Sequence, residues 1–306
     1  MVGNIKNISV SVHDRLRNMA REASRPFNEL LQHFAIERFI YRLSKSPHAD
    51  RFIPKGTLML PVWSGYVSRP TMDIDLLAKI NNSLEEIEAA MRDACKMDVE
   101  EDGMFFNEQT VSASRITEDA EYEGVRVRIK GNLGNARVSL QIDIGFGDVI
   151  VPGPGKVAYP TLLEFPSPEL NGYTMETTIA EKYQAMVKLG VLNSRMKDFY
   201  DIWMLSRSFD FNGEVMAEAI ERTFMNRKTD LTNDPAIFDT SFGRDVTRLV
   251  QWQGFIRKSR LSNVPGDFGV VLADIKLFLE SPVRSLVDRR TFHSTWKASG
   301  LWVPTG

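Results

Sequence analysis

Two aspartates, Asp73 and Asp75, lie two residues apart inside an otherwise apolar run of the chain. In a β-strand, residues i and i+2 point to the same face, so the two carboxylates are expected side by side, while Ile74 and Leu76 point into a core. Adjacent carboxylates repel each other unless a cation lies between them. Oxygen ligands at this spacing suit Mg²⁺ or Mn²⁺. The pattern therefore predicts a metal site; the alternative is a pair of acids that face only water.

A second expected strand supplies a third acid. Residues 137–144 alternate between polar and apolar side chains, and the apolar positions are Val138, Leu140, Ile142 and Ile144. Asp143 is the only acid on the polar side of this segment. Two carboxylates on one strand and a third on another are the set that a two-metal phosphoryl-transfer site needs. The third carboxylate can also take the proton of an attacking hydroxyl.

A short turn before the acid pair is a candidate for phosphate binding. Lys55-Gly56-Thr57 follows an apolar stretch and precedes Asp73 by a helix-sized gap. Glycine lets backbone N–H groups approach a phosphate closely, and the Thr57 hydroxyl adds a donor. An ordinary turn is the alternative interpretation.

Five other polar residues have settings that suit contact with a nucleotide. Arg69 either neutralises a triphosphate or forms a structural ion pair, and Thr71 shares the face of the acid pair if the strand extends that far. Lys182 lies at the edge of an apolar helix stripe, where a lysine usually extends to solvent but also suits a triphosphate as a point charge. Asp198 begins the next expected helix and either stabilises the helix dipole or, with Lys197, reaches the nucleotide.

Composition restricts the class of protein. The chain has 306 residues, of which 43% are hydrophobic and 25% charged, as in a soluble globular protein with room for two domains. The sequence contains no apolar run long enough for a membrane helix, and its N-terminus lacks the apolar segment of a secretory signal. The single cysteine, Cys95, cannot form an internal disulfide. We therefore expect a cytoplasmic enzyme without a membrane partner.

Charge is distributed unevenly along the chain. Residues 81–123 contain 13 acidic and 3 basic residues, whereas residues 251–306 contain 8 basic and 4 acidic ones. This asymmetry is compatible with a polyanion that binds the C-terminal half. A solvated helix face is the equally weighted alternative.

The expected elements fall into two domains. Helices are expected over residues 10–45 and 82–97, and strands over 73–78, 125–130 and 137–144. Residues 152–168 are rich in proline and glycine and read as an irregular linker, after which the pattern is helical. The sequence thus predicts an α/β (α+β) fold. A nucleotidyltransferase-like mixed-sheet domain with N-terminal helices covers residues 1–165, and a helical C-terminal domain covers residues 166–306.

Taken in order, these segments resemble the AbiEii/AbiGii-type nucleotidyltransferase toxins, which include the MenT toxins. The matching segments span most of residues 10–210 and are Lys55-Gly56-Thr57, Arg69-x-Thr71-x-Asp73-x-Asp75-Leu76, Gln141–Asp148, Ala180-Glu181-Lys182 and Arg195-x-Lys197-Asp198-x-x-Asp201. The chain departs from the family pattern at Thr57, which replaces the second residue of a Gly-Gly or Gly-Ser turn.

The resemblance implies a DNA-polymerase-β-like nucleotidyltransferase core that uses Mg²⁺ (or Mn²⁺) and an NTP. Asp73, Asp75 and Asp143 would then be metal ligands, and Lys182 and Asp198 would be catalytic or nucleotide-binding. The resemblance also implies a toxin encoded beside an antitoxin, which is often a winged-helix DNA-binding protein. Some relatives add nucleotides to the 3′ end of tRNA.

Three hypotheses follow. The first is a toxin of a toxin–antitoxin (abortive infection) system that transfers NMP from an NTP to an RNA acceptor, with tRNA 3′ ends favoured. The second keeps this chemistry but directs it to a protein or a small molecule. The third is a non-catalytic interaction protein that retains the fold.

Overall fold

A computed structural model describes residues 7–65, 71–116, 124–298 and 300–305. The chain forms two compact units. The first comprises the chain up to Gly147 together with Gly155–Gly172, and the second comprises Asp148–Pro154 together with the chain from Tyr173 onward. The division expected after residue 165 falls inside the second segment of the first unit. In the part of the chain that the structure describes, no helix combines the length and apolar character needed to cross a membrane.

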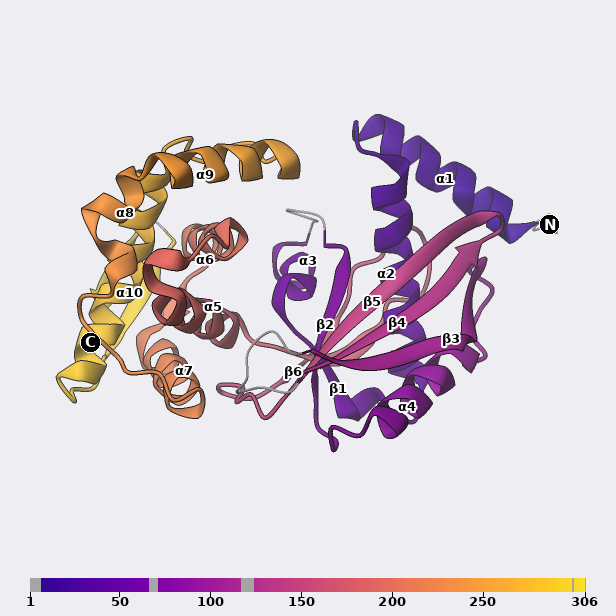
Figure 1. Ribbon diagram of the computed structural model, residues 1–306, viewed down its shortest axis with the longest axis horizontal. Helices are drawn as coiled ribbons and strands as arrows, with labels where there is room; N and C mark the ends of the chain where they lie inside the picture. The colour runs from indigo at the N-terminus through magenta and orange to yellow at the C-terminus, as the bar shows by residue number, and fades with distance from the viewer. Residues whose placement is uncertain (1–6, 66–70, 117–123, 299, 306) are drawn as a thin grey trace. The chain divides into compact units, whose positions relative to one another are not determined.

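The first unit is built on a five-stranded mixed sheet with the strand order β1-β2-β5-β4-β3 (Figure 1). The strands are β1 (Phe52–Pro54), β2 (Asp73–Ala78), β3 (Met104–Ile116), β4 (Gly124–Leu133) and β5 (Ala136–Phe146). β2 and β5 run parallel, and the other neighbouring strands run antiparallel. The helices are α1 (Ile8–Glu22), α2 (Phe27–Lys45), α3 (Leu60–Ser64) and α4 (Leu84–Lys96). A hairpin of β6 (Gly155–Ala158) and β7 (Glu169–Gly172) completes the unit.

The two faces of this sheet differ because the strands alternate. Ile74, Leu76, Ile142 and Ile144 are at most 1% exposed and join a core that includes the apolar sides of α2 and α4. α4 runs beside β3 in Figure 1, in agreement with its contacts. Burial of each such side chain stabilises the fold by about 1.5–3 kcal/mol. The intervening residues of β2, β4 and β5 are polar and lie on the opposite face.

The expected helix over residues 10–45 is two helices. α1 ends at Glu22 and α2 begins at Phe27, directly after Pro26. Proline lacks a backbone N–H and is tolerated at a helix start but not in a helix interior. The break therefore coincides with the one residue of this stretch that cannot continue a helix.

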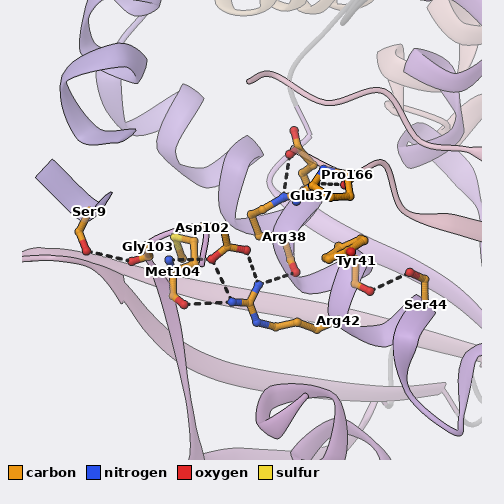
Figure 2. A network of polar contacts seen from close by, with 10 residues as sticks. All are labelled: Ser9, Glu37, Arg38, Tyr41, Arg42, Ser44, Asp102, Gly103, Met104 and Pro166. Carbon is orange, nitrogen blue, oxygen red and sulfur yellow. Dashed lines mark hydrogen bonds and ion pairs between the residues drawn. The ribbon is translucent and has the colours of Figure 1, made fainter. Parts of the chain in front are cut away.

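A buried polar network ties α2 to the start of β3, as Figure 2 shows. The Arg42 guanidinium donates to both carboxylate oxygens of Asp102, at 2.6 and 2.9 Å, and to the Met104 carbonyl at 3.1 Å. Asp102 also accepts from the Met104 backbone N–H at 2.9 Å. One turn earlier, Glu37 and Arg38 form an ion pair at 2.9 Å with side chains at most 1% exposed. These bonds fix the helix against the sheet from its buried side.

The second unit is mainly helical. Its helices are α5 (Met175–Leu189), α6 (Met196–Ser208), α7 (Gly213–Asn226), α8 (Thr240–Arg244), α9 (Val246–Ser259) and α10 (Phe268–Val287). It also contains a small antiparallel sheet, in the order β10-β9-β8, of β8 (Phe211–Asn212), β9 (Ser294–Lys297) and β10 (Leu301–Pro304). The sequence pattern missed these strands because four residues or fewer are too short to establish a period of two. The mixed α/β class predicted from the sequence is confirmed.

Candidate active site

The three predicted acids lie on two adjacent parallel strands. In the β2–β5 register, Asp75 lies beside Asp143 and Asp73 beside Gln141. Residues paired in this way in a parallel sheet share a face, so all three carboxylates project from the polar face of the sheet. The short strand β2 pairs with the C-terminal half of the longer β5, and Figure 1 shows the two strands side by side. Segments almost seventy residues apart in sequence thus meet at one place.

We call Asp73, Asp75 and Asp143 the acid row. The predicted glycine turn packs directly against one of these residues, Asp75. The Lys55 backbone N–H donates to the Asp75 carbonyl at 2.9 Å, which continues the β1–β2 pairing by one residue. Gly56 follows with φ +64°, and a Cβ at this position would lie 2.9 Å from the Asp75 Oδ2. Only glycine meets both conditions without strain. Thr57 is buried. The turn therefore meets the Asp75 carboxylate with backbone alone, because residue 56 has no side chain. We call this contact of the turn with Asp75 the cradle.

A guanidinium holds the third carboxylate. Arg126 on β4 lies opposite Asp143 in the antiparallel β4–β5 register. Its Nε donates to Oδ1 and its Nη2 to Oδ2, both at 2.8 Å, and both side chains are about one quarter exposed. Such a two-pronged pair fixes the plane of a carboxylate. Oδ2 also accepts from the Gln141 side-chain amide at 3.4 Å, which leaves the second lone pair of Oδ1 for another partner.

Asp73 and Asp75 are suited to bind a divalent cation as a pair of ligands. Asp73 and Asp75 offer hard oxygen donors on one face, and the glycine at position 56 places no side chain against the Asp75 carboxylate. Mg²⁺ commonly binds one or two carboxylates and takes its other ligands from water and substrate phosphates. Among the described residues, no group of three or more histidine, cysteine or acidic side chains is arranged to hold a metal. The role of Asp143 as a third ligand stays a prediction.

Two of the other predicted nucleotide contacts belong to this unit. Thr71 precedes β2, and its hydroxyl donates to the Asp73 carbonyl at 3.0 Å, so it lies close to the acid row. Arg69 lies outside the residues that the structure describes.

The remaining predicted residues lie in the second unit. The Lys182 ammonium, 11% exposed on α5, bonds to the carboxylates of Asp198 at 2.7 Å and Asp201 at 2.8 Å on α6. Asp198 also pairs with Arg195 at 2.7 Å. Lys197 is exposed. Lys182 is thus held in a cluster that includes Asp198, Asp201 and Arg195, and nucleotide contact by this cluster stays a prediction.

Arg126 and Asp201 contribute more to these arrangements than the sequence indicated. Arg126 belongs to a strand of alternating cations, but which acid it meets depends on the β4–β5 register. Asp201 appears in the last matching motif, yet its partner Lys182 lies on another helix. In the sequence, Arg126 and Asp201 look like ordinary charged residues, and only the fold identifies the partner of each.

The family model for the nucleotidyl transferase AbiEii toxin of type IV toxin–antitoxin systems matches residues 38–273. The chain therefore belongs to the AbiEii nucleotidyltransferase toxin family, and it is a nucleotidyltransferase, as its motifs predicted. This match covers the C-terminal part of α2 from residue 38, the entire five-stranded sheet, the acid row and the Lys182 cluster.

One solved structure, MenT4, shows the same fold. MenT4, the nucleotidyltransferase toxin Rv2826c from Mycobacterium tuberculosis, matches with a TM-score of 0.53 at 16% identity, over 90% of this chain and 99% of MenT4. JHP933 from Helicobacter pylori matches with a TM-score of 0.48 at 14% identity, over 86% of this chain and 97% of that one. The comparison with curated proteins yields no match.

Proposed function

We propose that this nucleotidyltransferase uses Mg²⁺ and an NTP to transfer NMP to the terminal 3′-hydroxyl of an RNA, with tRNA as the favoured acceptor. One arrangement above all supports this function: Asp75 lies beside Asp143 on adjoining strands, with Gly56 packed against Asp75. Acids meet there on an open polar face, next to a backbone turn that admits a phosphate.

The chain's residues have separate tasks in this reaction. Asp73 and Asp75 would hold the divalent cation, which neutralises the phosphate charge when bound. The 3′-oxygen of the acceptor forms a bond to the α-phosphorus, the bond from that phosphorus to the bridging oxygen breaks, and pyrophosphate leaves. The proton of the attacking hydroxyl passes to the Asp143 carboxylate. Arg126 keeps that carboxylate oriented.

The other nucleotide contacts rest on the order of the motifs. Arg69, Thr71, Lys182, Lys197 and Asp198 lie in the segments whose motifs resemble those of the family. We assign the triphosphate to Lys182 and Arg69, since both carry a permanent cation at neutral pH.

A type IV toxin–antitoxin family implies an antitoxin partner. We propose a winged-helix DNA-binding protein for that role and the cytoplasm as the location of both proteins.

Incubation of the purified protein with total RNA, Mg²⁺ and each α-³²P-labelled NTP in turn tests the acceptor. The wild type is expected to label a tRNA-sized band, and Asp73→Asn is expected to label none because it removes a metal ligand. Asp98→Asn is the matched control, since Asp98 is exposed and lies outside the acid row. Circular dichroism of all three proteins verifies that they fold.

Label in protein but not in RNA would overturn the RNA acceptor while leaving the chemistry intact. Equal labelling by wild type and a folded Asp73→Asn would overturn the site itself. The same two variants are also expected to differ in cells: Asp98→Asn should still inhibit growth, and Asp73→Asn should not.

A further inference from the structure

The polar face of the sheet carries a groove that begins next to the acid row. Residues of β3, β4 and β5 line it, together with the β4–β5 turn, and they include Phe105, Asn107, Lys130, Asn132, Arg137 and Ser139. We call these six residues and the space between them the sheet groove. All of them belong to the first unit.

The strand registers order these residues into two rows across the sheet. Asn107, Lys130 and Ser139 form the nearer row, and Phe105, Asn132 and Arg137 form the farther one. Ser139 is two residues from Gln141, which lies beside Asp73. Because two residues of a strand span about 7 Å, the groove starts one row from Asp73 and two rows from Asp75 and Asp143, and it continues away from them on the same face.

The sheet groove is basic although the chain as a whole has a net charge of −2. Lys130 and Arg137 are exposed, and Arg128 is an exposed cation on the same face of β4, between the groove and the Arg126–Asp143 pair. None of these three cations has an ion-pair partner among the described residues, and no described residue that lines the groove is acidic. The groove therefore presents uncompensated positive charge to a polyanion.

An aromatic side chain stands at the far row. Phe105 is 54% exposed, whereas its neighbours Met104 and Phe106 are buried on the other face. An exposed phenylalanine on a sheet surface beside cations is the combination that binds single-stranded nucleic acid, because bases stack on the ring while the cations hold the phosphates. The Asn107 Oδ1 already accepts from the Gln109 N–H and the Asn132 Nδ2 already donates to the Gly134 carbonyl, so these amides offer chiefly the Asn107 Nδ2 as a donor and the Asn132 Oδ1 as an acceptor.

We propose that the sheet groove binds the single-stranded end of the RNA acceptor and leads its last nucleotide to the acid row. This assignment deepens the proposed function and rests on it for the identity of the RNA. Lys130, Arg137 and Arg128 contact phosphates, and Phe105 stacks on a base.

Fluorescence anisotropy of a labelled, short single-stranded RNA oligonucleotide tests the cations without NTP and without catalysis. The double variant Lys130→Ala/Arg137→Ala is expected to bind more weakly and to reduce the slope of log K against log salt by about 1.4, since each lost phosphate contact removes about 0.7. Lys96→Ala is the matched control, because Lys96 is an exposed cation on α4, the helix that packs on the opposite face. A salt slope in the double variant equal to that of Lys96→Ala would overturn the proposal.

Substitution of Phe105 tests the stacking contact separately. Phe105→Ala is expected to weaken RNA binding by about 5- to 100-fold with an unchanged salt slope, and Phe105→Trp is expected to retain binding. Undiminished affinity of Phe105→Ala would remove the base contact from the proposal. Because the side chain is more than half exposed, the substitution leaves the core intact.

Transfer kinetics separate this proposal from the proposed function. If it is correct, the groove variants raise the KM for RNA and leave the KM for NTP unchanged. If wild-type protein transfers label to RNA and the groove variants keep the wild-type KM for RNA, the groove assignment is wrong and the function stands. If the wild type binds RNA through the groove but transfers no nucleotide, the groove stands and the function is wrong.

Discussion

At the scale of single residues, the sequence predicted that Asp73, Asp75 and Asp143 share one face of the sheet but not which residues hold them there. The spacing of Asp73 and Asp75 and the alternation around Asp143 were enough to predict one shared face, and the parallel register places them there. The fork of Arg126 on Asp143 and the closeness of Gly56 to Asp75 Oδ2 were beyond prediction, because both depend on strand partners distant in the chain.

Gly56→Ala tests the cradle against Asp75. A left-handed φ costs a residue with a Cβ about 1–2 kcal/mol, and here the added Cβ would also press on the Asp75 Oδ2. Gly65→Ala has a similar φ of +74° but meets nothing within 4 Å, so it is a matched control for the backbone cost. We expect a larger loss of unfolding free energy in Gly56→Ala than in Gly65→Ala, and a loss of transfer activity in Gly56→Ala alone. Full activity of Gly56→Ala would contradict the cradle.

Arg126→Met tests whether Asp143 needs orientation. The pair is about one quarter exposed, so its loss is expected to change the free energy of unfolding by less than about 1 kcal/mol. The kcat is expected to fall by about 10- to 100-fold, as for other residues that orient catalytic groups. Arg126→Lys keeps the positive charge but not the two-pronged contact, so its kcat should lie between those of the wild type and Arg126→Met. An unchanged kcat in Arg126→Met would show that Asp143 acts without its partner.

At the scale of elements, α2 carries more buried charge than its sequence suggested. Its apolar periodicity predicted a core helix, which is correct, but Glu37, Arg38 and Arg42 are also buried. Their partners in other segments, Asp102 and the backbone of Leu162 and Pro166, explain this burial. A helical pattern identifies the buried side of a helix, but it does not reveal which distant groups neutralise the charges there.

Asp102→Asn is expected to destabilise the first unit by about 3–5 kcal/mol, because it leaves the Arg42 charge buried without its counter-ion. The double variant Arg42→Met/Asp102→Leu removes both charges and should recover most of this loss. Chemical denaturation measures both effects, with Asp98→Asn as the exposed control. If the double variant were as unstable as Asp102→Asn alone, the loss would come from packing and not from the unpaired charge.

Two titrating groups on α2 are expected to give opposite pH dependences. Burial lowers the pKa of His33 to about 4, and the charge of Arg25 adds to this effect. Burial raises the pKa of Glu37 to about 7 against the opposing charge of Arg38. The contribution of His33 to stability is therefore complete above its ordinary pKa of 6.5 and is lost as pH falls toward 4. That of Glu37 is complete below 4.5 and is lost as pH rises through about 7.

Variants separate these two contributions. Between pH 4.5 and 6.5 they oppose each other, so His33→Gln should make the unfolding free energy fall more steeply with rising pH than in the wild type. Glu37→Gln should make it rise more steeply, and each change corresponds to about 3 kcal/mol across the full titration. Denaturant titrations at several pH values measure the slopes. Stability curves parallel to that of the wild type would contradict the burial of the two groups.

At the scale of the whole molecule, the ordered motifs identified the family and the α/β class, and the family model and the sheet confirm both. Charge counts along the chain were less informative. They directed attention to the basic C-terminal residues, whereas the uncompensated cations of the sheet groove lie on one face of β4 and β5 in the first unit. A count over a segment averages the two faces of a strand, and only the register separates them.

Label position in the NTP tests the central claim of nucleotidyl transfer at the acid row most directly. Wild-type protein is incubated with RNA and Mg²⁺ and with the same NTP carrying ³²P either at the α or at the γ position, beside Asp73→Asn and Asp98→Asn. We predict that α-label enters the acceptor and γ-label appears in pyrophosphate, in wild type and Asp98→Asn but not in Asp73→Asn. Appearance of γ-label in the acceptor, or undiminished transfer by a folded Asp73→Asn, would contradict the account.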